Sequence, residues 1–346
     1  MNVSSQMRRA VHAASRRHSR LRPSSFPRSA SLASAPGGRH LSSTGGGGDD
    51  DDDIPEDAAT VIQGPSLLTG TSVHRPSPSL FHLPGLRSLP FWTAPSSGGD
   101  GRHRVAYGDP SVSHVVETVE EAFEDIRDEY LSAVVGRGSE TDPLGDAGVS
   151  SPMEPDYDVN QRGGEHASDA LHSGSWDWHS YVLNGQRQER FAERCPKTAA
   201  VVDGLAEDGL LFETPFAFCF YSTLAGKSSI KPHVGPMNLR LRLHLPLLVP
   251  EGGGGKVSSS SADGAVDRPA CGLRVGDQVR EWEAGKAMIL DDSYEHEVWN
   301  DASDLRVLLL LDVWHPDVRP EERTRIRKMF EYARGKGWIG KEGPEE

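Results

Sequence analysis

Two histidines and an arginine in the second half of the chain have residue types and spacing that suit a metal-dependent site. His233 follows a proline, His296 opens an expected strand after a turn, and Arg306 comes ten residues later. Two imidazoles from separate strands can hold a first-row divalent metal such as iron, zinc, copper or nickel. A guanidinium deep between strands can bind a carboxylate through two hydrogen bonds. Together the three residues predict a site for a metal and a carboxylate.

A metal beside a buried carboxylate-binding arginine is the arrangement that a 2-oxoglutarate dioxygenase requires. The keto acid chelates iron at one end, and the protein holds its far carboxylate at the other. Such sites usually add an Asp or Glu to the two histidines. Here the residue two positions after His233 is Gly235, which has no side chain to offer. Glu295 and Glu297 flank His296, so strand alternation directs them to the opposite face. We therefore expect two protein ligands, with water at the third position.

The strand that must carry part of this site is visible in the alternation of residues 238–247. Leucines occupy every second position on one face, and the other face carries Asn238, Arg240, Arg242 and His244. A period of two predicts a β-strand with one packed face. We expect Arg240 to be structural, whereas Arg242 and His244 are candidates for the site. The alternative is an ordinary solvent-exposed strand face.

The second half of the chain has the pattern of a β-rich domain. Turn signals containing glycine or asparagine separate short apolar runs. Many short strands with this spacing favour a mainly β fold, a double-sheet jelly roll of the cupin-like class, with flanking α-helices. The expected strands are residues 216–222, 238–249, 273–279, 286–291, 295–300 and 305–313, and the last two are expected to form a hairpin. The expected helices are residues 112–134, 196–206 and 320–338.

Composition divides the chain into four parts. Residues 1–48 contain eight arginines and no Lys, Asp or Glu, so they contribute +8 to a net charge of −14, and the remainder carries −22. A basic, serine-rich leader without an apolar core predicts a mitochondrial transit peptide, with a plastid address or a basic nucleic-acid-binding tail as alternatives. Residues 49–79 predict a disordered acidic linker, residues 80–320 the catalytic domain, and residues 321–346 a helical tail.

Charge and hydropathy exclude several classes of protein. The acidic remainder argues against a nucleic-acid partner for the body of the chain. No apolar run approaches the ~18–20 residues that a transmembrane helix needs. Three cysteines, with no C-x-x-C pair, cannot build a disulfide framework or a structural zinc site.

Several sequence blocks, in order along residues 80–320, resemble the catalytic domain of the aspartyl/asparaginyl β-hydroxylase family. The blocks are HLPGLRSLPFW (82–92), CPKTA (195–199), PHVGPMNLRLRLHL (232–245), CGLRVG (271–276), WEAGKAMILDDSYEHEVW (282–299) and DVWHP (312–316). The resemblance implies the double-stranded β-helix form of the jelly roll. It also implies an enzyme that uses Fe(II), O₂ and 2-oxoglutarate to hydroxylate a substrate, with release of succinate and CO₂.

The same resemblance implies roles for individual residues. His233 and His296 match the two iron ligands, and Gly235 fits because the family itself lacks the usual carboxylate. Arg306 matches the arginine that binds the distal carboxylate of 2-oxoglutarate. Three further residues match positions that contact the cosubstrate: Ser222, Arg242 and His244.

The substrate is open at this stage. The resemblance favours the β-carbon of an Asp or Asn in a protein or peptide, and a lipid acyl chain or a small metabolite is the alternative. An organelle leader points away from the secretory pathway, and the Gly/Ser-rich insertion at 251–267 changes one loop. Two other activities are possible: a halogenase that binds chloride beside Gly235, and a non-catalytic jelly roll that only binds a ligand.

Overall fold

The computed structural model describes residues 75–94, 104–136, 152–158, 171–250, 256–259 and 266–337. The predicted leader (1–48) and nearly all of the predicted acidic linker (49–79) lie outside the described residues, so both stay predictions. The described residues contain no helix with the length and apolar character to cross a bilayer.

Two antiparallel sheets face each other and form the centre of the fold. The larger sheet contains, in order, β14 (Met288–Leu290), β9 (Arg240–Leu248), β16 (Arg306–Trp314), β7 (Phe218–Leu224), β5 (Trp176–Leu183) and β3 (Tyr157–Asp158), with β6 (Gln186–Arg187) paired to β5. The smaller contains β13 (Gln278–Arg280), β12 (Cys271–Val275), β15 (His296–Asn300), β8 (Ser228–His233) and β4 (His172–Ser173). Two further antiparallel pairs are separate two-stranded sheets: β1 (Thr93–Ala94) with β2 (Arg104–Val105), and β10 (Lys256–Ser259) with β11 (Val266–Pro269).

The chain alternates between the two sheets as it runs through the main strands. β7, β9, β14 and β16 belong to the larger sheet, whereas the intervening β8, β12 and β15 belong to the smaller. This alternation is the double-stranded β-helix form of the jelly roll, so the predicted fold class is confirmed. The predicted hairpin of β15 and β16 is wrong, because β15 pairs with β8 and β12 whereas β16 pairs with β7 and β9. The two residues carried by these strands, His296 and Arg306, therefore reach the interior from opposite sheets.

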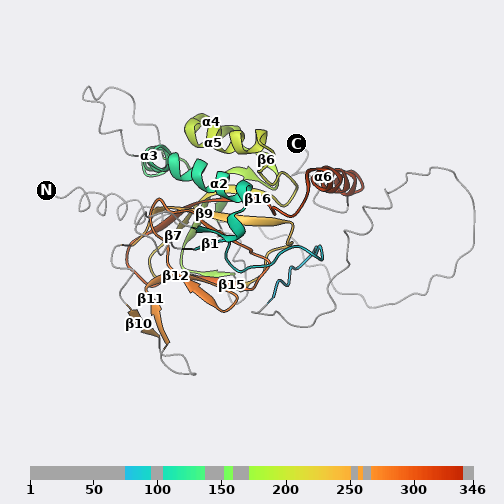
Figure 1. Cartoon of the computed structure of the whole chain (residues 1–346). Coiled ribbons are helices and arrows are strands. Elements are labelled where there is room, and N and C mark those ends of the chain that lie inside the picture. The colour runs from blue at the N-terminus through green and yellow to red at the C-terminus, as the bar shows by residue number, and fades with distance from the viewer. Residues whose placement is uncertain are drawn as a thin grey trace, which may run out of the picture.

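Helices cover the outer face of the larger sheet (Figure 1). They are α2 (Pro110–Glu121), α3 (Phe123–Ala133), α4 (Glu189–Arg194) and α5 (Pro196–Glu207), while a one-turn η1 (Ala106–Gly108) precedes α2 and α6 (Pro320–Gly335) closes the described chain. The predicted helix at 112–134 is two helices, because Ala122 has a ψ of 3° and interrupts the helical backbone. Asp109 caps α2 by accepting hydrogen bonds from the amides of Ser111 and Val112.

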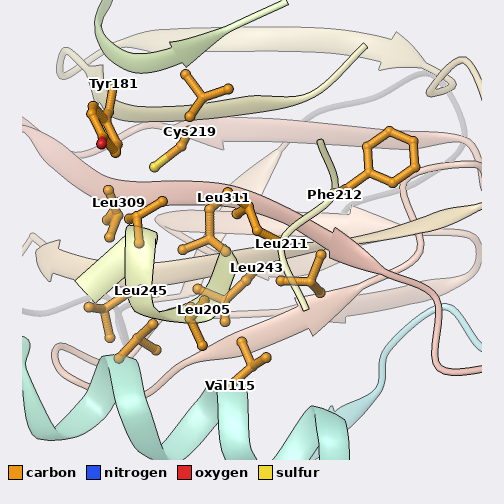
Figure 2. Packing of buried hydrophobic residues seen from close by; sticks show 14 of the residues in the cluster. Val115, Tyr181, Leu205, Leu211, Phe212, Cys219, Leu243, Leu245, Leu309 and Leu311 are labelled. Carbon is orange, nitrogen blue, oxygen red and sulfur yellow. The ribbon is translucent and has the colours of Figure 1, made fainter. Parts of the chain in front are cut away.

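The leucines of β9 pack against these helices. All five leucines at odd positions from 239 to 247 are at most 1% exposed and belong to the core cluster between the larger sheet and the helices. Figure 2 shows Leu243 and Leu245 in this cluster together with Val115 of α2 and Leu205 of α5. A one-residue slip of β9 would exchange its two faces, so burial of the leucines also fixes Arg240, Arg242 and His244 on the side that faces the smaller sheet.

Each expected strand of the second half exists with shifted ends, except that residues 273–279 cover a hairpin of β12 and β13 turning at Gly276. Gly276 and Gly285 have φ values of 59° and 76°, the left-handed conformation that turns ask of glycine. β8 was not expected, because the segment Ser228–His233 has one strongly apolar residue and contains Pro232. It is nevertheless a central strand, and it carries His233.

Candidate active site

His233 and His296 lie directly opposite each other on neighbouring strands. They are register partners in the β8–β15 pair, and their ring centroids are 4.0 Å apart. Nδ1 of His233 lies 2.8 Å from the carbonyl oxygen of Lys231, and Nδ1 of His296 lies 2.9 Å from that of Tyr294. A carbonyl oxygen only accepts, so each Nδ1 donates and each Nε2 presents a lone pair. Histidines that bind metals show this orientation, with one ring nitrogen held by a backbone carbonyl.

Both rings are neutral at physiological pH. Burial lowers the pKa of His233 below its ordinary value. For His296, burial and then the neighbouring His233 lower the pKa to about 3. Metal binding needs the unprotonated ring, so neither histidine must lose a proton before it can act as a ligand.

The carboxylate of Asp292 occupies the space beside Gly235. A Cβ built on Gly235 would lie 2.6 Å from Cγ and from both carboxylate oxygens of Asp292. The amide of Gly235 also donates to the carbonyl oxygen of Asp292 at 2.6 Å. Asp292 is fully buried, and its Oδ1 has no hydrogen-bond partner among the described residues. Residue 235 itself offers no carboxylate, but the carboxylate of Asp292 lies next to it in space. Any side chain at position 235 would have to displace this carboxylate.

Two arginines and two aspartates form a buried network at this end of the site. Arg240 is 1% exposed and donates to Asp312 and, through Nη2 at 2.9 Å, to Asp292. Arg242 Nε lies 2.9 Å from Oδ1 of Asp312, and its Nη1 lies 3.2 Å from Oδ2 of Asp292. Burial alone would raise the pKa of Asp292, but Arg240 and Arg242 outweigh it and lower that pKa to about 2. The four charges therefore compensate one another.

Arg306 lacks such compensation. Its side chain is 2% exposed, and its Nε and Nη2 have no hydrogen-bond partner within the described part of the chain. Its Nη1 reaches the hydroxyl of Ser222 at 3.5 Å, and that hydroxyl also accepts from Nε1 of Trp176 at 2.9 Å. Burial lowers the pKa of Arg306 to about 10. A buried guanidinium with two unused donor groups calls for an anion.

One cavity of about 240 Å³ brings all the predicted site residues together. Its lining includes Ser222, His233, Arg242, His244, His296 and Arg306. Asp292 and Arg240 also line it, as do the aromatic side chains Trp176, Trp178, Phe218 and Phe220. Among the described residues, no group of three or more His, Cys, Asp or Glu side chains is placed to bind a metal. The assignment of His233 and His296 as the two protein ligands stays a prediction.

Sequence reasoning missed two carboxylates of this site. Asp292 was assigned to a turn, and Asp312 was expected in a strand without a role. A signal was present for Asp312: an aspartate inside the run RVLLLLDVW must be buried, and a buried carboxylate needs a cationic partner. Arg240 was expected to be structural; it forms ion pairs with both aspartates and also lines the cavity.

Comparisons with known proteins agree with the geometry. A model of the aspartyl/asparaginyl beta-hydroxylase family matches residues 120–316. The chain is 28% identical over 250 residues to the mouse aspartyl/asparaginyl beta-hydroxylase, an alignment that covers 72% of this chain and 26% of the mouse protein. It is 35% identical over 141 residues to the ornithine lipid ester-linked acyl 2-hydroxylase of Rhizobium tropici, covering 40% of this chain and 42% of that protein.

The chain thus spans about a quarter of the length of its mouse relative. Among solved structures, a Trichoplax adhaerens prolyl hydroxylase in complex with a peptide fragment aligns at 13% identity with a TM-score of 0.28, over 60% of this chain and 94% of that one. The family match covers more than half of the chain, including every residue assigned to the site. The chain belongs to the aspartyl/asparaginyl beta-hydroxylase family.

Proposed function

We propose that the protein is an Fe(II)- and 2-oxoglutarate-dependent dioxygenase that hydroxylates a C–H bond. The observation that carries the proposal is the pairing, within one cavity, of two neutral imidazoles with a buried, uncompensated guanidinium. The imidazoles suit a divalent metal, and the guanidinium suits the carboxylate at the far end of a dicarboxylic keto acid. Family membership supports the same chemistry.

His233 and His296 would hold the metal through Nε2, and Arg306 with Ser222 would hold the distal carboxylate of 2-oxoglutarate. Fe(II) bound there would activate O₂, the oxidant, so that one oxygen atom is added to the substrate and the other enters succinate as 2-oxoglutarate loses CO₂. The unpaired Oδ1 of Asp292 is an acceptor for a water or a substrate N–H beside Gly235. Arg240 and Arg242 keep that carboxylate charged and in place.

Arg306 gives a direct test of the cosubstrate assignment. Replacing it by leucine removes the only charge-assisted partner proposed for the distal carboxylate, and we expect the KM for 2-oxoglutarate to rise by about 30-fold or more, the effect of losing one member of a buried charged pair. Arg306→Lys keeps the charge without the fork of N–H donors and should lie in between. The measurement is succinate formation against 2-oxoglutarate concentration.

Arg274→Lys is the matched control for that test. Arg274 lies on the outer face of the smaller sheet and pairs with Glu295 and Glu297, away from the cavity. It should leave the KM unchanged. An unchanged KM in Arg306→Leu would contradict the cosubstrate assignment.

The family name suggests an Asp or Asn side chain as the substrate, and the lining of the cavity also suits an apolar chain. Trp178 stacks on Phe220 with ring centroids 4.1 Å apart and planes at 17°, and Phe218 meets Trp178 edge to face at 5.9 Å. This aromatic wall, together with Leu310, can hold an apolar chain by burial. The lipid acyl hydroxylase among the relatives makes an acyl chain the second candidate substrate.

A competition assay separates the two candidates. The protein, Fe(II) and 2-oxoglutarate are incubated with an Asp- and Asn-containing peptide and with an acylated amino-acid lipid, and mass spectrometry locates the added oxygen. If the aromatic wall holds the substrate, the acyl chain is hydroxylated and Phe220→Ala slows that reaction by about tenfold, as removal of a large buried aromatic contact implies. Hydroxylation of the peptide alone, unaffected by Phe220→Ala, would reject the acyl chain.

A further inference from the structure

Trp282 connects two residues of the cavity that come from different strands. It lies between β13 and β14 and is 7% exposed. Its indole Nε1 is 3.4 Å from Nδ1 of His244 on β9, and Cζ of Arg306 on β16 lies 5.0 Å from the centre of its ring. The two contacts place Trp282 behind both groups that face the cosubstrate.

The direction of the indole hydrogen bond decides which proton His244 carries. An indole N–H can only donate, so Nδ1 of His244 must be the acceptor. Burial first, and then Arg306 and Arg242, lower the pKa of His244 well below its ordinary value, so the ring is neutral. A neutral ring with a bare Nδ1 carries its hydrogen on Nε2. His244 therefore offers an N–H donor, whereas His233 and His296 each offer an Nε2 lone pair.

The contact between the Trp282 ring and the guanidinium helps to hold Arg306 in position. Arg306 has no carboxylate partner among the described residues that line the cavity, so its position depends on neutral neighbours. The face of an indole attracts a guanidinium, and the attraction grows when both are removed from water. Trp282 thus stabilises the buried cation without occupying the N–H groups that are left for an anion.

We propose that Trp282 is a positioning residue, which keeps His244 as an Nε2–H donor and braces Arg306, so that both groups donate to the bound keto acid. The inference rests on the proposed use of 2-oxoglutarate. In the opposite tautomer, His244 would turn a lone pair toward a carboxylate, and it would add a third metal-binding imidazole to a cavity built for two. The indole N–H prevents both.

Trp282→Phe separates the two contacts, because phenylalanine retains an aromatic face for Arg306 but cannot donate to His244. Trp299→Phe is the matched control. Trp299 is similarly buried, donates one hydrogen bond to the carbonyl of Pro269 and has the guanidinium of Arg268 4.5 Å from its ring centre, but neither of these two partners lines the cavity. The first measurement is the tautomer of His244 in the metal-free full chain, from long-range ¹H–¹⁵N correlation spectra assigned with His244→Gln.

Wild type and Trp299→Phe should show His244 with a bare Nδ1 and a protonated Nε2, and Trp282→Phe should show a mixture of tautomers.

The second measurement is kinetic. Trp282→Phe should raise the KM for 2-oxoglutarate by about three- to tenfold, the effect of one hydrogen bond, with little change in kcat. Trp282→Phe made in the His244→Gln variant should cause no further rise in KM, because the histidine through which Trp282 acts is already absent.

An unchanged tautomer in Trp282→Phe, or an equal rise in KM when Trp282→Phe is made in the His244→Gln background, would overturn the positioning role. The outcome is distinguishable from failure of the proposed function. If Arg306→Leu also leaves the KM for 2-oxoglutarate unchanged, the cosubstrate assignment fails. If Arg306→Leu raises the KM while Trp282→Phe alters neither tautomer nor KM, the role of Trp282 alone fails.

Discussion

Replacing His296 by alanine is expected to abolish 2-oxoglutarate turnover. Loss of a partner that merely orients a metal ligand costs about 10- to 100-fold in activity, so loss of one of the two proposed metal ligands should cost at least about 100-fold. The cost is high here because no third protein ligand stands among the described residues to hold the metal in place. Succinate formation and the metal content of anaerobically reconstituted protein are the two measurements.

The expected loss should be chemical, not structural. His114→Ala serves as the matched control, because His114 lies on α2 with an exposed side chain that contacts Asp208 outside the cavity. We expect it to keep full turnover and full metal content. His296→Ala should retain the circular dichroism spectrum and cooperative thermal unfolding of the wild type. Full turnover by folded His296→Ala would refute the metal assignment.

The second large effect is expected on stability, from Arg240→Met. Methionine fills a similar volume but leaves the buried carboxylates of Asp292 and Asp312 short of one cation. Removing one partner from a buried ion pair costs about 3–5 kcal/mol in free energy of unfolding, since the remaining charge stays in a dry environment. Urea denaturation followed by fluorescence measures the loss.

Arg187→Met is the contrasting variant. Arg187 pairs with Asp203 at 2.9 Å, but the two side chains are 45% and 41% exposed. Exposed pairs contribute about 0–1 kcal/mol, so this change should be nearly neutral. Equal effects of the two substitutions would show that the buried network does not stabilise the fold.

The same network predicts the dependence of stability on acid. The pKa of Asp292 is about 2 in the folded protein against an ordinary value of 3.8, so the folded state binds its proton less readily than the unfolded state. Its contribution to stability is therefore complete above the ordinary pKa and is lost as the pH falls toward 2. Arg240→Met removes the largest pairing that lowers this pKa, and its acid unfolding should shift to higher pH. An unshifted acid midpoint would contradict this role of Arg240.

The sequence was sufficient for features that local pattern controls. The alternation of β9 predicted both of its faces, because packing of the leucines against the helices leaves the arginines and His244 only one direction. Blocks shared with the family marked His233 and His296 as candidate iron ligands, and the structure places the two residues opposite each other on neighbouring strands. β8 was not predicted, because its sequence contains a proline and few apolar residues. The strand forms because it pairs with β15 and β4.

Contacts between distant segments were decided only by the tertiary structure. Gly235 read as a missing carboxylate, yet Asp292 brings one into the same space from 57 positions along the chain. Trp282 contacts both His244 and Arg306, which lie on two different strands. The physical reason is common to both. Composition and periodicity report which face of a strand is buried, but the partner of a buried polar atom depends on how two sheets pack, and no period in the sequence encodes that.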